Sequence, residues 1–222
     1  MLKPFVVALT SLTLAGCSVF GVRSGTEQPA YSVREVLDDR TEIRDYAVRL
    51  AAQTEVPLAD GRNAALNEAF GRLAGYIFGK NQGAREIAMT APVEVARSQG
   101  TTIAMTAPVE TVTEGQQMRM RFFLPAEIRR ADAPTPVDPQ VNLVEVPAEI
   151  LAVRRFTGLR HTAAVDAQAA ALLEAVRAAG YQPDGPVVSY FYDPPWTIPF
   201  LRRNEVAVAV LEPADARGGE GH

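Results

Sequence analysis

The sequence predicts an α+β domain: two β-α-β-β repeats share a core, as a curved antiparallel sheet or distorted β-barrel with two outer helices. Two segments with helical periodicity are each flanked by segments in which apolar residues alternate. These segments follow the same order in both halves of the chain. The 222 residues, 47% of them hydrophobic, are enough for one large domain.

The first half is expected to contain one helix, over residues 62–78. Leu66, Phe70 and Leu73 form one apolar stripe on it, and Gly79 ends it. The strands expected around this helix span residues 31–37, 41–56, 86–96, 102–113 and 118–124. The proline-rich segment 129–140 is expected to be a loop.

The second half repeats this order. A strand over 148–157 precedes a helix that is expected to start at an N-cap, Thr162, and to end before Gly180. Strands over 187–192 and 205–211 close the domain, and residues 213–222 are expected to be a disordered tail.

Composition excludes several classes of protein. A net charge of −4 and a pI near 5.3 argue against a general nucleic-acid binder. One cysteine and two histidines exclude an intrachain disulfide and leave little material for a multi-histidine metal centre.

The N-terminus has the pattern of an export signal. Lys3 precedes an apolar run, residues 5–14, that is too short to span a bilayer. The run leads into Leu-Ala-Gly-Cys ending at Cys17, which resembles the lipobox of bacterial lipoproteins; a plain secretory signal is the alternative. The resemblance implies a signal peptide over 1–16, lipidation of Cys17 and a flexible tether over 17–30. Ser18 then implies the outer membrane, with the domain facing the periplasm.

One octapeptide occurs twice. Ile-Ala-Met-Thr-Ala-Pro-Val-Glu covers 87–94 and again 103–110, which predicts a hairpin of neighbouring strands. Met89 and Met105 are suited to an adaptable pocket wall, although filling the core is the simpler role. The repeated carboxylates, Glu94 and Glu110, are expected at the surface.

At this repeat the chain resembles the SOUL heme-binding protein family. Three motifs carry the resemblance: Tyr76-Ile-Phe-Gly-Lys-Asn with the doubled octapeptide, Tyr192-Asp-Pro-Pro-Trp, and Arg202-Arg-Asn-Glu-Val. The resemblance covers residues 31–212. It implies a distorted barrel related to gyrase-inhibitor-like ligand-binding domains, and binding of heme or another tetrapyrrole.

The resemblance also places the ligand slot beside the first helix and the loop before the last strand. Heme needs an apolar slot and cations near its propionates. The candidate ligand-binding residues are Arg62, Leu66, Phe70, Leu73, Met89, Met105, Trp196, Phe200 and Arg202. Arg203 is a further possible partner of a propionate.

An axial iron ligand is harder to assign. His161, the only histidine in the expected fold, precedes a helix, where a capping side chain is more common than a ligand. Catalytic motifs are absent from the sequence: there is no Gly-x-Ser-x-Gly elbow and no phosphate-cradling glycine loop. We therefore expect a tethered, non-catalytic binding protein for heme or a similar flat amphipathic ligand. The alternatives are an enzyme that uses the same cleft and a structural envelope lipoprotein with a closed pocket.

Overall fold

The computed structural model describes residues 26–98 and 117–212, and within them the chain forms two compact units. The first unit contains the residues up to Ala47 and those from Glu149 onward, and the second is Val48–Ala148. The expected signal peptide, Cys17, the strand over 102–113 with Met105, and the tail over 213–222 lie outside the described residues.

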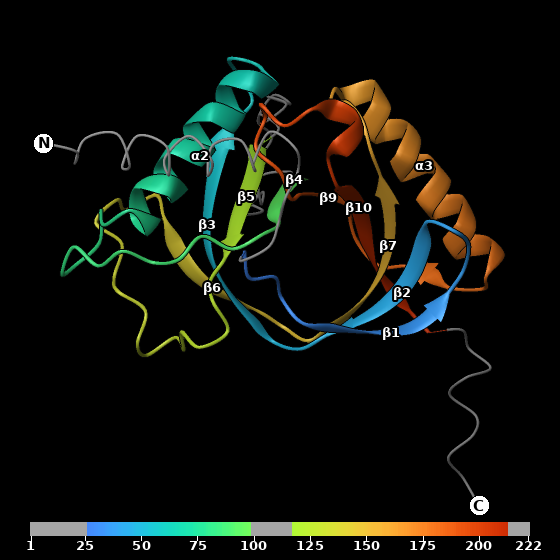
Figure 1. The fold of residues 1–222 in the computed structure, drawn as a ribbon, viewed down its shortest axis with the longest axis horizontal. Coiled ribbons are helices and arrows are strands. Elements are labelled where there is room, and N and C mark those ends of the chain that lie inside the picture. The colour runs from blue at the N-terminus through green and yellow to red at the C-terminus, as the bar shows by residue number, and fades with distance from the viewer. Residues whose placement is uncertain (1–25, 99–116, 213–222) are drawn as a thin grey trace, which may run out of the picture. The chain divides into compact units, whose positions relative to one another are not determined.

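The first unit is an antiparallel sheet with one helix. Its strands are β1 (Tyr31–Val36), β2 (Thr41–Tyr46), β7 (Glu149–Phe156), β9 (Val188–Phe191) and β10 (Asn204–Leu211), with a short β8 (Gln182–Pro183) paired to β10. The sheet order is β1-β2-β7-β10-β9. The helix α3 (Thr162–Ala178) follows β7 and packs against β7 and β10 (Figure 1).

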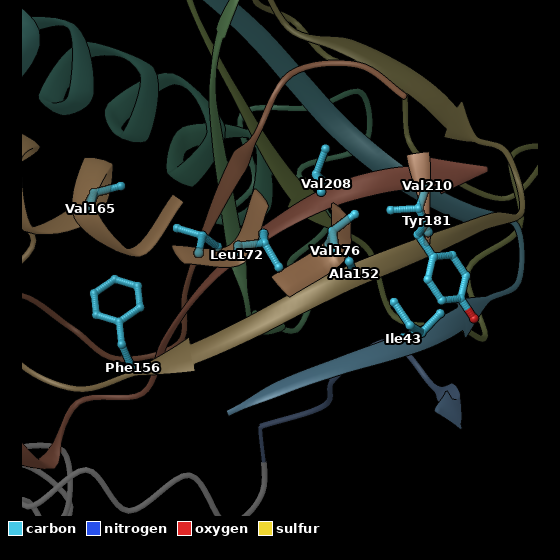
Figure 2. Close-up of a cluster of buried hydrophobic side chains, with 10 residues drawn as sticks. Ile43, Ala152, Phe156, Val165, Leu172, Val176, Tyr181, Val208 and Val210 are labelled. Carbon is cyan, nitrogen blue, oxygen red and sulfur yellow. The ribbon is translucent and has the colours of Figure 1, made fainter. Parts of the chain in front are cut away.

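The core of this unit lies between α3 and its sheet. Leu172 and Val176 on the helix meet Ala152, Val206 and Val208, which alternate on the facing side of β7 and β10. Figure 2 draws the ten residues of this cluster, with Ala152 of β7 and Val208 of β10 beside Leu172 and Val176 of α3. β7 and β10 are buried or half-buried along most of their length, as strands in the middle of a covered sheet are.

The second unit has the same construction. Its strands are β3 (Arg49–Pro57), β4 (Val93–Ser98), β5 (Gln117–Phe123) and β6 (Asn142–Val146), in the order β4-β5-β3-β6. The helix α2 (Arg62–Ile77) follows β3 and packs against β3 and β5 (Figure 1). Ala65, Ala69 and Leu73 are its buried face.

The two predicted β-α-β-β repeats are confirmed, as is the α+β class. They are β3-α2-β4-β5 and β7-α3-β9-β10, and in both the last strand pairs with the first and with the middle strand. One further strand pairs with the first strand of each repeat. β2, which precedes the first repeat in the chain, pairs with β7 of the second, and β6, which precedes the second repeat, pairs with β3 of the first.

Four local expectations were wrong. The strand expected over 41–56 is two strands, because the chain stops pairing with β7 after Tyr46 and pairs with β6 from Arg49. The strand expected from residue 86 begins at Val93, because the Ile87 N–H bonds Ile77 O (2.9 Å) and the Thr90 hydroxyl bonds Phe123 O. Strand β6 was not expected. His161, not Thr162, is the N-cap of α3.

In the described ranges, 26–98 and 117–212, neither helix has the length and apolarity needed to span a bilayer.

Candidate functional site

The chain between β9 and β10 presents two large aromatic side chains to the surface. Trp196 is 64% exposed and Phe200 is 70% exposed. Thr197 N–H donates to Pro194 O (3.1 Å), and Leu201 N–H donates to Ile198 O (2.9 Å) in a 3₁₀ turn, η1 (Pro199–Leu201). This stretch, residues 193–203, is called the aromatic segment below.

Arginines fix the aromatic segment by bonding its backbone. Arg202 donates to the carbonyl oxygens of Thr197 and Pro195, at 2.7 Å each. Arg160 donates to Asp193 O (2.6 Å). The Asp193 carboxylate accepts the Arg203 N–H (2.7 Å), so both ends of the segment are tied together. The two exposed aromatics are thus carried on a braced backbone rather than on a loose loop.

This bracing gives Arg202 a structural role that the sequence did not predict. Two of its five N–H donors hold backbone carbonyls. An interaction with a ligand carboxylate, as expected from the sequence, would have to use the remaining donors.

Positive charge is concentrated behind the exposed aromatics. Burial and the neighbouring charge of Arg202 lower the pKa of Arg160 to about 10, and Asp193 opposes that shift. The charge of Arg202 disfavours the charged form of Arg160, and an anionic group placed near Arg160 would relieve this effect. The segment therefore combines exposed apolar area with two neighbouring arginines.

A third exposed apolar side chain lies alongside. Leu159 is 55% exposed, and the preceding residue, Gly158, donates its N–H to Pro199 O (2.9 Å), which brings the two segments together. Leu159, Trp196 and Phe200 are called the apolar patch below. All three belong to the first unit.

Behind the aromatic segment lies a buried charge network that the sequence analysis did not identify. Glu205, the second residue of β10, is fully buried. One carboxylate oxygen accepts bonds from Arg203 (2.7 Å and 3.0 Å). The other accepts from Arg44 on β2 (3.2 Å) and from the Tyr192 hydroxyl (2.6 Å). A glutamate between Asn204 and Val206 in an otherwise apolar strand was the available signal, because charged residues are seldom fully buried unless paired.

The network keeps Glu205 ionised. Burial alone would raise the pKa of this carboxyl, but Arg44 and Arg203 outweigh burial and hold the pKa below its usual range. Burial and the adjacent Glu205 carboxylate raise the pKa of Tyr192, which stays a protonated hydrogen-bond donor. The group is a closed ion cluster whose visible role is to hold β2, β10 and the aromatic segment together.

The second unit holds the other predicted ligand-binding residues that the structure describes. On α2, Arg62 and Leu66 are half-buried and Leu73 is fully buried in the core. Phe70 is 44% exposed and stands edge-on to Phe122, with 5.4 Å between ring centroids. Met89 is 38% exposed. Phe70 and Met89 therefore remain accessible, whereas Leu73 serves the core.

Glu94 corrects a sequence expectation. It is almost fully buried, not at the surface, because it lies opposite Arg121 in the β4–β5 ladder and forms ion pairs with Arg121 (3.1 Å) and Arg119 (3.4 Å). Among the residues that the structure describes, each unit thus has one buried glutamate paired with two arginines.

His161 is a capping residue. Its Nδ1 accepts the Ala164 N–H (3.1 Å) at the start of α3, as expected for a histidine in this position. No cluster of three or more His, Cys, Asp or Glu able to hold a metal ion occurs in the described part of the chain.

These residues fit a heme in part. Exposed aromatics on a braced backbone suit the face of a macrocycle, and arginines suit its propionates. The Nδ1 atom of His161 accepts the hydrogen bond of the helix cap, so an iron ion would have to be bound by Nε2.

Comparison with known proteins gives the same fold at low sequence identity. The C-terminal domain of EcmrR matches with a TM-score of 0.56 and 8% identity, over 78% of this chain and 98% of that one. Two proteins from Listeria innocua match at 10% identity over 78% of this chain and 92% of theirs: an uncharacterized conserved protein (TM-score 0.55) and a protein described as a hydrolase (TM-score 0.51). No curated protein matches in sequence.

The family comparison is specific. The model of the SOUL heme-binding protein family matches residues 26–209, which include both β-α-β-β repeats, the aromatic segment and the Glu205 network. This match agrees with the motifs read in the sequence. The chain belongs to the SOUL heme-binding protein family.

Proposed function

We propose that this domain binds heme or a related tetrapyrrole through the aromatic segment, without chemistry of its own. The observation that carries the proposal is the pair of exposed aromatics, Trp196 and Phe200, on a backbone braced by Arg160 and Arg202. Because the segment is already ordered, covering it with a ligand costs little conformational entropy.

The arrangement suits a ligand that is flat, apolar and anionic at its edge. A planar macrocycle stacks on a large aromatic ring, and its carboxylates favour the positive charge of the Arg160–Arg202 pair. Phe70 and Met89 in the second unit are also accessible.

A binding role also agrees with how the buried acids are used. Glu205 and Glu94 are each neutralised by two arginines, which is typical of structural ion clusters rather than of general bases. We further propose that the mature protein is lipidated at Cys17 and tethered to the outer membrane, with the domain in the periplasm.

Hemin titration tests the proposal. The mature chain should give a saturable shift of the Soret band and parallel quenching of Trp196, the only tryptophan in the chain. Binding of hemin that does not saturate would contradict the proposed function. Saturable binding with unquenched tryptophan would move the site away from the aromatic segment. Product analysis after incubation with hemin and a reductant should return intact heme, whereas a ring-opened product would make the protein an enzyme.

A further inference from the structure

We infer that the apolar patch, Leu159, Trp196 and Phe200, docks on the lipid bilayer and holds this face of the tethered domain against the membrane. The inference rests on the proposed Cys17 anchor for its geometry. It gives the patch a second role, since a ligand held on this face would be exchanged directly with the membrane.

The point where the tether enters the fold supports this orientation. The side chain of Gln28 accepts a hydrogen bond from Arg203 (3.2 Å), and the Arg203 backbone N–H is held by Asp193. The chain is therefore fastened to the aromatic segment itself. Cys17 lies only eleven residues before Gln28, a span of at most about 40 Å when fully extended.

Such a short tether keeps the patch close to the bilayer. A linker of this length gives an effective concentration of order millimolar, so a weak surface contact is enough to fix the orientation. Without that contact, the domain would turn freely about its tether.

The chemistry of the patch suits the membrane–water interface. Tryptophan is enriched at the level of the headgroups, and phenylalanine and leucine insert among the acyl chains. The half-buried Arg160 and Arg202 lie behind the patch, where their charge favours anionic lipid. The bracing of the segment means that its side chains are already presented outward before contact.

The single cysteine allows a direct test. The mature chain, coupled through Cys17 to maleimide-headgroup lipid in phosphatidylethanolamine/phosphatidylglycerol vesicles, reproduces the tether without cellular acylation. A doxyl group near the top of the acyl chains then reports how closely Trp196 approaches the bilayer. No hemin is added, so the result is independent of heme binding.

We expect a blue shift and strong quenching of Trp196 in the tethered wild type. Phe200→Ser and Leu159→Ser should each lower the ratio of docked to undocked domain by about tenfold, the loss expected for one exposed apolar side chain. Phe78→Ser is the matched control, because Phe78 is 65% exposed but belongs to the second unit, and it should be quenched like wild type.

Three results would overturn the inference: an unquenched tethered wild type, patch variants that are quenched like wild type, or a Phe78→Ser variant that loses quenching as much as Phe200→Ser. Hemin titration of the same proteins without vesicles is read separately. Failure of membrane docking is thereby distinguished from failure of ligand binding.

Discussion

Trp196→Ala is the most direct perturbation of the proposed ligand site. A tryptophan side chain presents up to about 250 Å², and 64% of Trp196 is exposed. The exposed part is therefore about 160 Å². A flat ligand that covers one of the two ring faces removes about half of this area, about 80 Å², from water. At about 25 cal/mol per Å², this contact contributes about 2 kcal/mol to binding. We expect the dissociation constant for hemin to rise by about 30-fold.

The Soret titration measures both proteins, because it does not depend on tryptophan. Thermal or urea unfolding is recorded alongside, and the change in stability should stay within about 1 kcal/mol, as for other surface substitutions. Phe78→Ala is the matched control: it removes an aromatic side chain of similar exposure from the second unit and should leave the hemin affinity unchanged.

An unchanged hemin affinity in Trp196→Ala, combined with unquenched emission in the wild type, would refute this reasoning. Equal losses in Trp196→Ala and Phe78→Ala would also refute it, because hemin would then be adsorbing to any exposed aromatic side chain.

Four further predictions address the anchor, iron ligation, the brace and the buried network. Cys17→Ser should abolish acylation and leave an uncleaved precursor or a soluble form; membrane fractionation and a mass identical to wild type would contradict the lipoprotein assignment. His161→Ala should leave the Soret spectrum of the hemin complex unchanged and cost about 1 kcal/mol of stability through loss of the helix cap; disappearance of a low-spin spectrum would instead make His161 the iron ligand. Arg202→Gln removes the bonds to the carbonyl oxygens of Thr197 and Pro195, so it should weaken hemin binding by loosening the segment, with little dependence on salt; a loss that disappears in high salt would show instead that Arg202 acts on an exposed propionate. Glu205→Gln should cost about 3–5 kcal/mol at pH 7, because it removes the buried carboxylate charge that pairs with Arg44 and Arg203. Since the folded pKa of Glu205 is lowered, the wild-type advantage is complete at neutral pH and is lost as the pH falls through that folded pKa; urea unfolding at several pH values measures this, and a pH-independent difference would contradict it.

Much of the fold followed from sequence periodicity. The stripe on 62–78 and the alternation in 118–124 each reflect a single buried face, and both elements appear within a residue or two of their expected limits. Where one buried face decides the structure, local pattern is sufficient.

The errors arose where long-range pairing decided the structure. Nothing local marks the end of β2 at Tyr46, because what changes there is the pairing partner, from β7 to β6. Strand β6 pairs along its length with β3, far away in sequence, and its burial is uneven. Both features depend on partners that periodicity does not encode.

The sequence analysis chose Trp196 and Phe200 as residues lining a ligand slot, and this assignment stays a prediction. The structure adds that both side chains are exposed. Arg202 and Arg203 were expected to bind the propionates of a ligand. In the structure, Arg202 donates to backbone carbonyls and Arg203 donates to Glu205. An arginine in a sequence shows its charge, but not which internal acceptors compete for its donors.

The four residues from Arg202 to Glu205, in the motif that resembles the family's closing signature, all hold parts of the first unit together. Arg202 holds the carbonyls of the aromatic segment, and Arg203 joins Glu205 to Gln28. Asn204 accepts a hydrogen bond from Arg160 and donates one to Gly158 O. Glu205 also accepts hydrogen bonds from Arg44 and Tyr192. Each of these four side chains makes hydrogen bonds within the domain.

The motif therefore specifies the conformation of the segment and not directly the ligand. In the proposed function, recognition depends on the side chains that the braced backbone presents outward, which are Trp196 and Phe200. A chain with the same closing motif and other residues at these two positions should keep the shape of the segment and change what it binds. In the proposed function, the braced backbone sets the shape of this surface, and the exposed aromatics set how flat and how apolar the ligand must be.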